Sequence, residues 1–186
     1  MYRLVLLDRD GVINHRPPPG PDGDPGNYIK TPAEWRPIAG GPEAVAALNA
    51  RGCRVAVCTN QSGIGRGIMS AEDLAVVHRH MEAAMRAAGA RLDRVYVCPH
   101  APDDACGCRK PRPGMLRAAM RDFGVTRSET CFVGDSQRDM DAALAAGCEP
   151  ILVRTGNGAE AEPGARAAGV QRVFDDLAAA ARGLAT

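Results

Sequence analysis

The stretch RLVLLDRDGVIN, residues 3–14, gives the clearest indication of the fold. Its opening run, Arg3–Leu7, is almost continuously apolar, which is typical of a strand buried on both faces of a parallel sheet. Asp8 and Asp10 follow at once. Two carboxylates one residue apart at a strand end can point to the same side. One could then attack or bind a metal while the other gives and takes a proton. The same pair is common in solvated turns, so the buried strand before it is what favours a site.

Five more apolar runs and five helical patterns follow along the chain. Short apolar runs predict strands at Arg54–Cys58, Arg94–Val97, Thr130–Val133, Ile151–Val153 and Arg172–Phe174. Helical spacing, with Pro or Ser at the start and Gly after the end, predicts helices at Pro42–Arg51, Ser70–Ala88, Pro113–Phe123, Ser136–Ala146 and Asp175–Arg182. This alternation predicts an α/β fold with a parallel sheet between helices. Function should then lie in the loops after the strands.

Composition excludes several classes of protein. A length of 186 residues suits a single domain, residues 1–186, and a net charge of +1 gives no general attraction to nucleic acid. No apolar run approaches the ~18 residues of a membrane span, and the N-terminus lacks a signal-peptide pattern. We therefore expect a cytoplasmic protein, a monomer without nucleic-acid or membrane partners. Its seven cysteines are more consistent with reduced thiols or metal ligands than with disulfides.

Polar residues that suit a phosphate group follow the other predicted strands. Thr59 opens the segment TNQSG, whose hydroxyls and main-chain amides suit phosphate oxygens. The glycines that follow do not lead into a Gly-Lys-Ser/Thr, so this is not a P-loop. Lys110 could neutralise a phosphoryl group and an attacking carboxylate together. Asp135 could complete a Mg²⁺ site. Taken singly, these residues could equally be a turn, a surface lysine and a helix cap.

The irregular segment after the third predicted strand carries a set of metal ligands. Three Cys and one His form a common closed site for structural Zn²⁺, and residues 98–108 hold such a set: Cys98, His100, Cys106 and Cys108. Their spacing is tighter than that of the usual zinc finger, and free thiols are the alternative. A zinc-binding loop here would fix the two cations that follow it, Arg109 and Lys110. Elsewhere, His78 and His80 lie two residues apart on the second predicted helix, and we expect surface or partly packed side chains, not ligands.

The ordered set DRDGVIN, CTNQSG, RKPRPG and GDSQRD resembles the haloacid dehalogenase superfamily of phosphotransferases. With NYIKTPAEW, TNQSGIGRG and CPH…CGCRKPRPGM added, nearly the whole chain is similar to the D-glycero-D-manno-heptose 1,7-bisphosphate phosphatases. That branch also includes the histidinol-phosphate phosphatases. The resemblance implies a three-layer Rossmann-like fold without a large cap domain.

The same resemblance implies a Mg²⁺-dependent phosphatase acting on a small phosphorylated sugar. The reaction would remove the 7-phosphate of heptose 1,7-bisphosphate through an aspartyl-phosphate, in the synthesis of ADP- or GDP-heptose precursors. Histidinol phosphate or another small sugar phosphate is the alternative substrate. A non-catalytic zinc-stabilised binding module is a further reading, and the intact set of chemical residues argues against it. A nucleic-acid end phosphatase fits poorly with near-zero net charge and seven aromatic residues.

Roles for individual residues also follow from the resemblance. Asp8 would be the nucleophile, and Asp10 would protonate the leaving group and then activate water. Thr59 and Lys110 would steady the phosphoryl group. Mg²⁺ would be held by Asp8, the Asp10 backbone carbonyl and Asp135, and Zn²⁺ by the four residues of the loop.

Substrate contacts carried over from the family concern six residues: Tyr28, Asn60, Gln61, Ser62, Arg109 and Ser136. Arg109 would pair with the second phosphate, since its planar fork suits a phosphate. The chain departs from the family at two places. A Pro/Gly-rich loop, residues 15–27, precedes Tyr28, and Ser136 stands where many members have lysine. Loss of that cation could weaken binding of the distal phosphate or change which substrate is preferred. Asp139 would then orient the site and not bind the metal directly.

Overall fold

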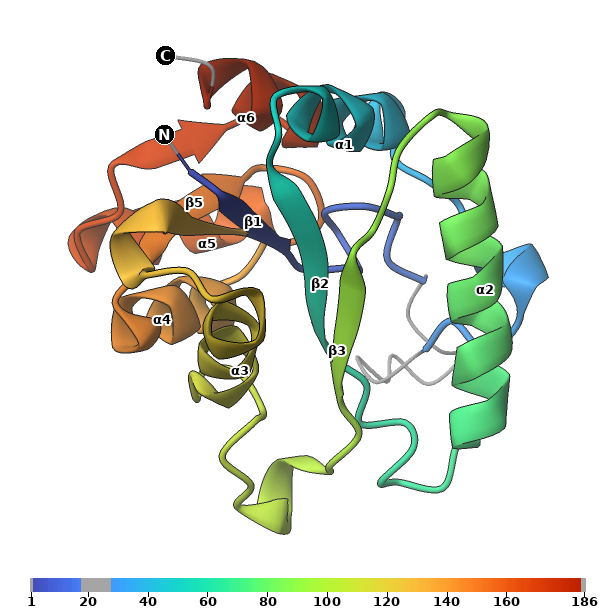
Figure 1. Ribbon diagram of the computed structural model, residues 1–186. Helices are drawn as coiled ribbons and strands as arrows, with labels where there is room; N and C mark the ends of the chain where they lie inside the picture. Colours follow the sequence, from blue (N-terminus) through green and yellow to red (C-terminus); the bar gives the residue numbers. More distant parts are fainter. Residues whose placement is uncertain (1, 18–27, 185–186) are drawn as a thin grey trace.

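Six parallel strands form one sheet in the computed structural model, which describes residues 2–17 and 28–184 (Figure 1). The strands are β1 (Leu4–Leu7), β2 (Arg54–Asn60), β3 (Arg94–Cys98), β4 (Thr130–Gly134), β5 (Glu149–Val153) and β6 (Arg172–Phe174). Their order is β3-β2-β1-β4-β5-β6, as expected for a Rossmann-like sheet. The six strands predicted from apolar runs are confirmed, with small differences at their ends. Most of the predicted loop, residues 18–27, lies outside the described residues.

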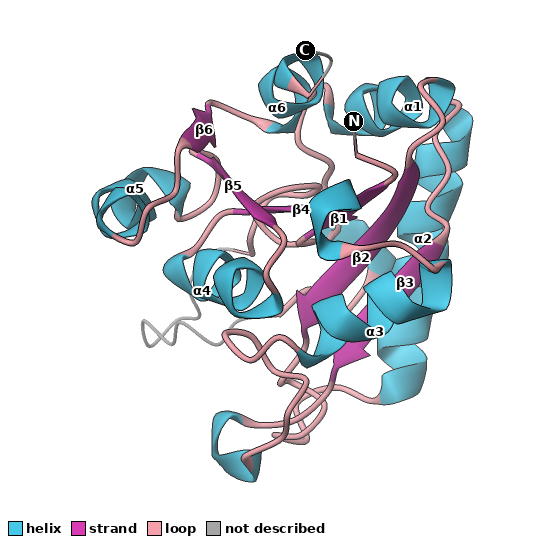
Figure 2. Cartoon of the chain, turned by 60° about the vertical axis from the view of Figure 1, so that its left-hand side comes forward, coloured by secondary structure: helices cyan, strands magenta, loops and turns pink. Residues whose placement is uncertain are grey.

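Helices cover both faces of the sheet (Figures 1 and 2). They are α1 (Gly41–Ala50), α2 (Ala71–Ala87), α3 (Gly114–Phe123), α4 (Gln137–Ala146), α5 (Gly158–Ala167) and α6 (Leu177–Gly183). Short 3-10 helices add Pro32–Glu34, Pro102–Asp104 and Arg127–Glu129. Within the two described ranges there is no further folded layer that could form a large cap. This confirms the expected three-layer α/β architecture.

Alternation along β1 assigns each helix to a face. Val5 and Leu7 pack with residues of α1, α2 and α6, whereas Leu4 and Leu6 pack with residues of α3 and α4. Leu152 of β5 packs in a smaller cluster with α4 and α5. Because successive side chains point to opposite faces, a nearly continuous apolar run is what such a doubly covered strand requires.

Helix α5 was not predicted from the sequence. It contains Pro163 near its middle, and Gly158 and Gly164 within ten residues. These residues are poor helix formers, so the local pattern is weak. The helix persists because Ala165 is fully buried in the cluster with Leu152.

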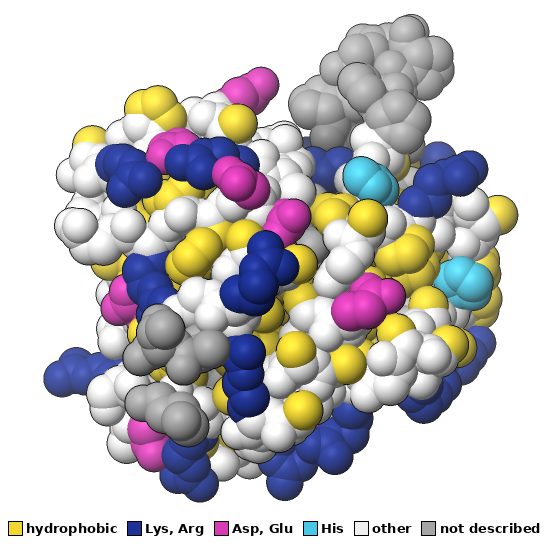
Figure 3. All heavy atoms as spheres, turned by 90° about the horizontal axis from the view of Figure 1, so that it is seen from above, with side chains coloured by type: hydrophobic (Ala, Val, Ile, Leu, Met, Phe, Trp, Pro, Cys, Tyr) yellow, Lys and Arg dark blue, Asp and Glu magenta, His cyan; other side chains and the backbone are white. Residues whose placement is uncertain are grey.

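The carboxyl ends of β1, β2 and β4 meet where the strand order reverses, next to the start of α4. The surface viewed from the top of Figure 1, where α1 and α6 lie, mixes basic and acidic side chains (Figure 3). No helix in the described part of the chain is long and apolar enough to cross a membrane.

Candidate active site

Asp8 and Lys110 meet at the end of β1. Lys110 Nζ lies 2.8 Å from Asp8 Oδ1, and the lysine side chain is only 2% exposed. Burial raises the pKa of Asp8 to about 7; the Lys110 charge opposes this shift, and the carboxylates of Asp139 and Asp135 add to it. Asp8, Asp10, Thr59 and Lys110 all line one cavity of about 290 Å³. The residues expected to carry the chemistry are therefore brought together.

Asp10 is held by donors on several sides. The Arg9 guanidinium donates to both of its carboxylate oxygens, at 2.9 to 3.1 Å. Asn14 Nδ2 donates at 2.9 Å and Gln61 Nε2 at 3.0 Å. Burial acts to raise the pKa of Asp10, but the Arg9 charge and these hydrogen bonds hold it below its usual value. Asp10 is thus fixed in one orientation facing the cavity.

Arg9 and its contact with His78 were missed by the sequence analysis. Arg9 is completely buried, and its Nη1 lies 3.1 Å from His78 Nε2 on α2. Burial, together with the Arg9 charge, lowers the pKa of His78 to about 4. The imidazole is therefore neutral and accepts a hydrogen bond from the guanidinium. The guanidinium thus lies between Asp10 and helix α2. The partner, 69 residues away, gives no local signal.

The residues after β2 divide between the cavity and its support. The Asn60 side chain forms two hydrogen bonds with the main chain of Lys110. Its Nδ2 donates to the Lys110 carbonyl and its Oδ1 accepts from the Lys110 N–H, both at 3.1 Å. Gln61 was expected to contact substrate. Instead it is buried beneath the cavity and donates to Thr59 Oγ1 at 2.8 Å as well as to Asp10. Asn60 and Thr59 line the cavity.

Tyr28 and Ser62 lie on the cavity wall, as the resemblance implies. Their hydroxyl oxygens are 3.0 Å apart. A Cβ at position 63 would lie 3.0 Å from the Tyr28 ring, so Gly63 permits this packing. Arg109 also lines the cavity, and its Nη1 donates to the His100 carbonyl at 3.4 Å.

Asp135 is completely buried and incompletely satisfied. Its Oδ2 accepts from the Asn157 N–H and pairs with Arg16 Nη1, both at 3.0 Å. Its Oδ1 has no hydrogen-bond partner among the described residues. A Cβ at Gly11 or at Gly156 would lie 2.0 Å from Oδ2, so both positions require glycine. Carboxylate oxygens of Asp8, Asp135 and Asp139 lie within 4.8 Å of one another. A buried, partly unpartnered oxygen in an acidic cluster fits a divalent cation.

Asp139 and Ser136 organise the first turn of α4. Asp139 Oδ1 lies 2.7 Å from Lys110 Nζ, and its Oδ2 accepts from Ser136 Oγ at 2.6 Å and from the Asp135 N–H at 3.2 Å. Both of its oxygens are therefore engaged. This geometry fits the orienting role expected for Asp139.

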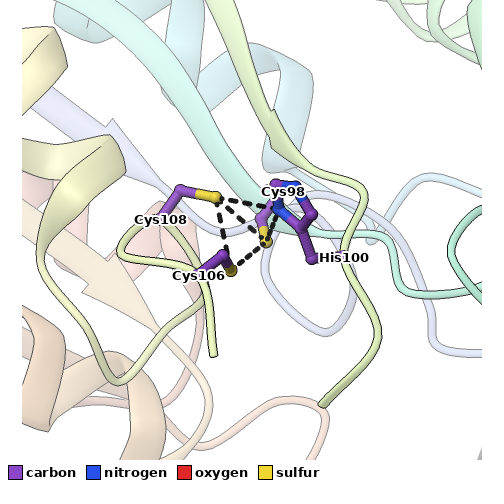
Figure 4. Close-up of side chains that lie close together, drawn as sticks. All are labelled: Cys98, His100, Cys106 and Cys108. Atoms are coloured by element: carbon purple, nitrogen blue, oxygen red, sulfur yellow. Dashed lines mark hydrogen bonds between the residues drawn. The ribbon is translucent and has the colours of Figure 1, made fainter. Parts of the chain in front are cut away.

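The four ligands of the 98–108 loop converge on one point (Figure 4). Five of their six pairs of ligand atoms are separated by 3.3 to 3.7 Å: Cys98 with His100, Cys106 and Cys108, and Cys108 with His100 and Cys106. A tetrahedral ion with ligands ~2.3 Å away would space them by about 3.7 Å. The donor set and its spacing therefore fit a closed zinc site.

Comparison with known proteins agrees with this geometry. Residues 107–180 match the HAD-hydrolase-like family model. The chain is 45% identical over 183 residues to the D-glycero-beta-D-manno-heptose-1,7-bisphosphate 7-phosphatase of Pseudomonas putida, covering 98% of this chain and 99% of that one. It is 35% identical over 155 residues to the D-glycero-alpha-D-manno-heptose-1,7-bisphosphate 7-phosphatase of Mycobacterium bovis, covering 80% of this chain and 78% of that one.

A solved structure gives the same result in three dimensions. The D,D-heptose 1,7-bisphosphate phosphatase of B. bronchiseptica, crystallised with magnesium and phosphate, superimposes with a TM-score of 0.89 at 40% identity, over 98% of each chain. Sequence, fold and site thus agree. The chain belongs to the haloacid dehalogenase-like hydrolases, within the family of heptose 1,7-bisphosphate phosphatases.

Proposed function

We propose that this chain hydrolyses the 7-phosphate of a D-glycero-D-manno-heptose 1,7-bisphosphate, leaving the 1-phosphate. The observation that carries the proposal is the position of Asp8. Its Oδ1 lies 2.8 Å from the Lys110 ammonium, and Asp10, two residues further along the chain, lines the same cavity. A carboxylate nucleophile, a cation for the transferring group and a second carboxylate for proton transfer are the parts that an aspartyl-phosphate mechanism requires.

The reaction proceeds in two displacements. In the first, an Asp8 carboxylate oxygen attacks phosphorus, the bond from phosphorus to the C7 oxygen breaks, and Asp10 gives its proton to the departing alkoxide. In the second, water attacks the phosphorus of the aspartyl-phosphate, Asp10 takes the proton of that water, and inorganic phosphate leaves as Asp8 is restored. Lys110 and the Thr59 hydroxyl hold the phosphoryl oxygens in both steps.

The metals have separate parts in this proposal. Mg²⁺ would be held by the Asp8 carboxylate, the Asp10 backbone carbonyl and Asp135, the residue with an unpartnered buried oxygen. When bound, it would offset the negative charge of the phosphoryl group and of Asp8. Zn²⁺ would be held by the 98–108 loop and would fix the segment that continues into Arg109 and Lys110. The zinc role is structural because its four ligands leave no open position.

The substrate assignment is supported by the relatives. Those at 41% to 45% identity are named for the beta anomer, and those at 35% from mycobacteria for the alpha anomer. We therefore assign the beta-anomeric bisphosphate as the preferred substrate. The reaction class that supplies it is phosphorylation of a heptose 7-phosphate at C1.

The test is phosphate release with Mg²⁺ from the beta and alpha heptose 1,7-bisphosphates and from histidinol phosphate, measured in parallel. The expected order of kcat/KM is beta above alpha above histidinol phosphate. A higher kcat/KM for histidinol phosphate would overturn the substrate assignment and leave the mechanism in place. Asp8→Asn should remove turnover without loss of folding, and near-normal turnover in that variant would overturn the nucleophile.

A further inference from the structure

Three guanidinium groups line the cavity without an acidic partner. Arg66 comes from the loop after β2, Arg109 from the end of the 98–108 loop, and Arg138 from the first turn of α4. Among the described residues, no carboxylate forms an ion pair with any of the three. The other two cations of the cavity differ: Lys110 pairs with Asp8 and Asp139, and Arg16 pairs with Asp135.

Two of the three groups lie where the cavity continues toward the 98–108 loop. Arg109 and Arg138 also line a neighbouring hollow beside that loop, together with Arg112 and Lys110. Neither Asp8 nor Asp10 lines that hollow, whereas Arg66 lines only the cavity itself. Guanidinium groups without an acidic partner that line one cavity give it a positive potential, which attracts an anion.

The 98–108 loop positions two of these arginines at once. Arg109 follows Cys108, and its Nη1 donates to the His100 carbonyl at 3.4 Å. The N–H of Gly65, next to Arg66, donates to the Pro99 carbonyl at 2.8 Å. A Cβ at Gly65 would lie 2.6 Å from the Ala101 nitrogen, so only glycine allows the two loops to approach this closely. Arg66 is thereby held beside the loop that carries Arg109.

Arg138 supplies the charge that Ser136 lacks. Ser136 carries no charge, and its hydroxyl donates to Asp139 Oδ2 at 2.6 Å. Arg138 lies two residues further along α4, is exposed, and lines the same cavity. The start of α4 therefore presents a cation to the cavity from position 138, although Ser136 has none.

Resting on the function proposed above, we propose that Arg66 and Arg138 act with Arg109 as specificity-determining residues that bind the phosphate the enzyme does not hydrolyse. Each planar guanidinium can donate two parallel hydrogen bonds to phosphate oxygens. Arg66 and Arg138 thus select a substrate with two phosphates over one with a single phosphate. The reacting phosphate is held separately, by Lys110 and Thr59.

The test compares heptose 1,7-bisphosphate with heptose 7-phosphate, which has the same reacting group and no distal phosphate. Arg138→Gln and Arg66→Gln should each lower kcat/KM for the bisphosphate on the order of tenfold or more, mainly through KM. Their kcat/KM for heptose 7-phosphate should stay within about threefold of wild type. Arg138→Lys should recover part of the loss. Arg79→Gln, on the exposed face of α2, removes the same charge away from the cavity and is the matched control.

Several outcomes would overturn the assignment of Arg66 and Arg138. Equal losses of kcat/KM with both substrates would mean that these residues contact the reacting phosphate or affect folding. An unchanged KM for the bisphosphate would mean that they do not bind the substrate. A wild-type enzyme that hydrolyses neither heptose ester would overturn the proposed function, and this inference with it. Wild-type preference for the bisphosphate that persists in both variants would overturn this inference alone.

Discussion

Lys110 Nζ lies 2.7 Å from Asp139 Oδ1, and both side chains are at least 98% buried. Burial acts to lower the pKa of Lys110, but Asp139 and Asp8 raise it further, so the ammonium stays charged. Asp139 is held in turn by Ser136 and by the Asp135 N–H. The lysine is thus fixed by a residue that need not touch the substrate.

Asp139→Asn should lower kcat/KM on the order of 100-fold, because Lys110 would lose the partner that fixes its ammonium beside Asp8. Steady-state kinetics on the bisphosphate measures the loss. Ser136→Ala removes only one hydrogen bond to Asp139 and should cost less, about tenfold or below. If Asp139→Asn keeps more than half of wild-type kcat/KM, the orienting role of Asp139 is wrong.

Arg9→Lys should lower kcat, with little change in KM. An ammonium cannot reproduce the fork that Arg9 places on both oxygens of Asp10, so the proton donor would lose its fixed orientation. The loss should be on the order of 10- to 100-fold for the heptose ester, whose alkoxide needs a proton to leave. The loss of kcat should be much smaller for p-nitrophenyl phosphate, whose leaving group departs without a proton. Equal losses on both esters would contradict a role through Asp10.

Much of the fold and of the site could be predicted because both depend on local pattern. Strands that are buried on both faces have nearly continuous apolar sequences. In a parallel sheet, the residues that follow the strands lie together at one edge. Asp8, Thr59 and Asp135 each follow such a run. Their proximity could therefore be predicted without knowledge of contacts between distant residues. Helix α5 was not predicted because its sequence contains helix-breaking residues. It is stabilised by a tertiary contact, the burial of Ala165.

The supporting contacts of the site could not be predicted. The buried Arg9 is paired with its neighbour Asp10 and also donates to His78, 69 residues away. Gln61 was expected at the substrate, but it is buried and its amide donates to Asp10 and Thr59. Charged and amide side chains are ambiguous in sequence, since they are usually exposed and their burial depends on a partner elsewhere in the chain.

Removal of zinc should loosen the 98–108 loop, which continues into Arg109 and Lys110. Chelation, or Cys106→Ser, should lower the melting temperature by about 5 °C or more and reduce kcat/KM for the bisphosphate more than for heptose 7-phosphate. The difference between substrates is expected because Arg109 and Gly65, the residue before Arg66, both contact residues 99–101. Cys53→Ser, outside the loop, is the control. Unchanged melting and kinetics after verified metal loss would contradict the structural role.

His78 should make folding stability depend on pH between about 6.5 and 4. Its pKa falls from 6.5 to about 4 on folding, so in this window the unfolded chain binds more protons than the folded one. Stability is therefore full above pH 6.5 and is lost as the pH falls toward 4, by at most roughly 3 kcal/mol. His78→Gln keeps an acceptor for Arg9 without titrating. The raised pKa of Asp8 acts in the opposite direction but is common to both proteins. Denaturant unfolding at pH 7 and pH 4.5 should show wild type losing stability relative to His78→Gln, and parallel curves would mean that the imidazole is not held neutral by burial and Arg9.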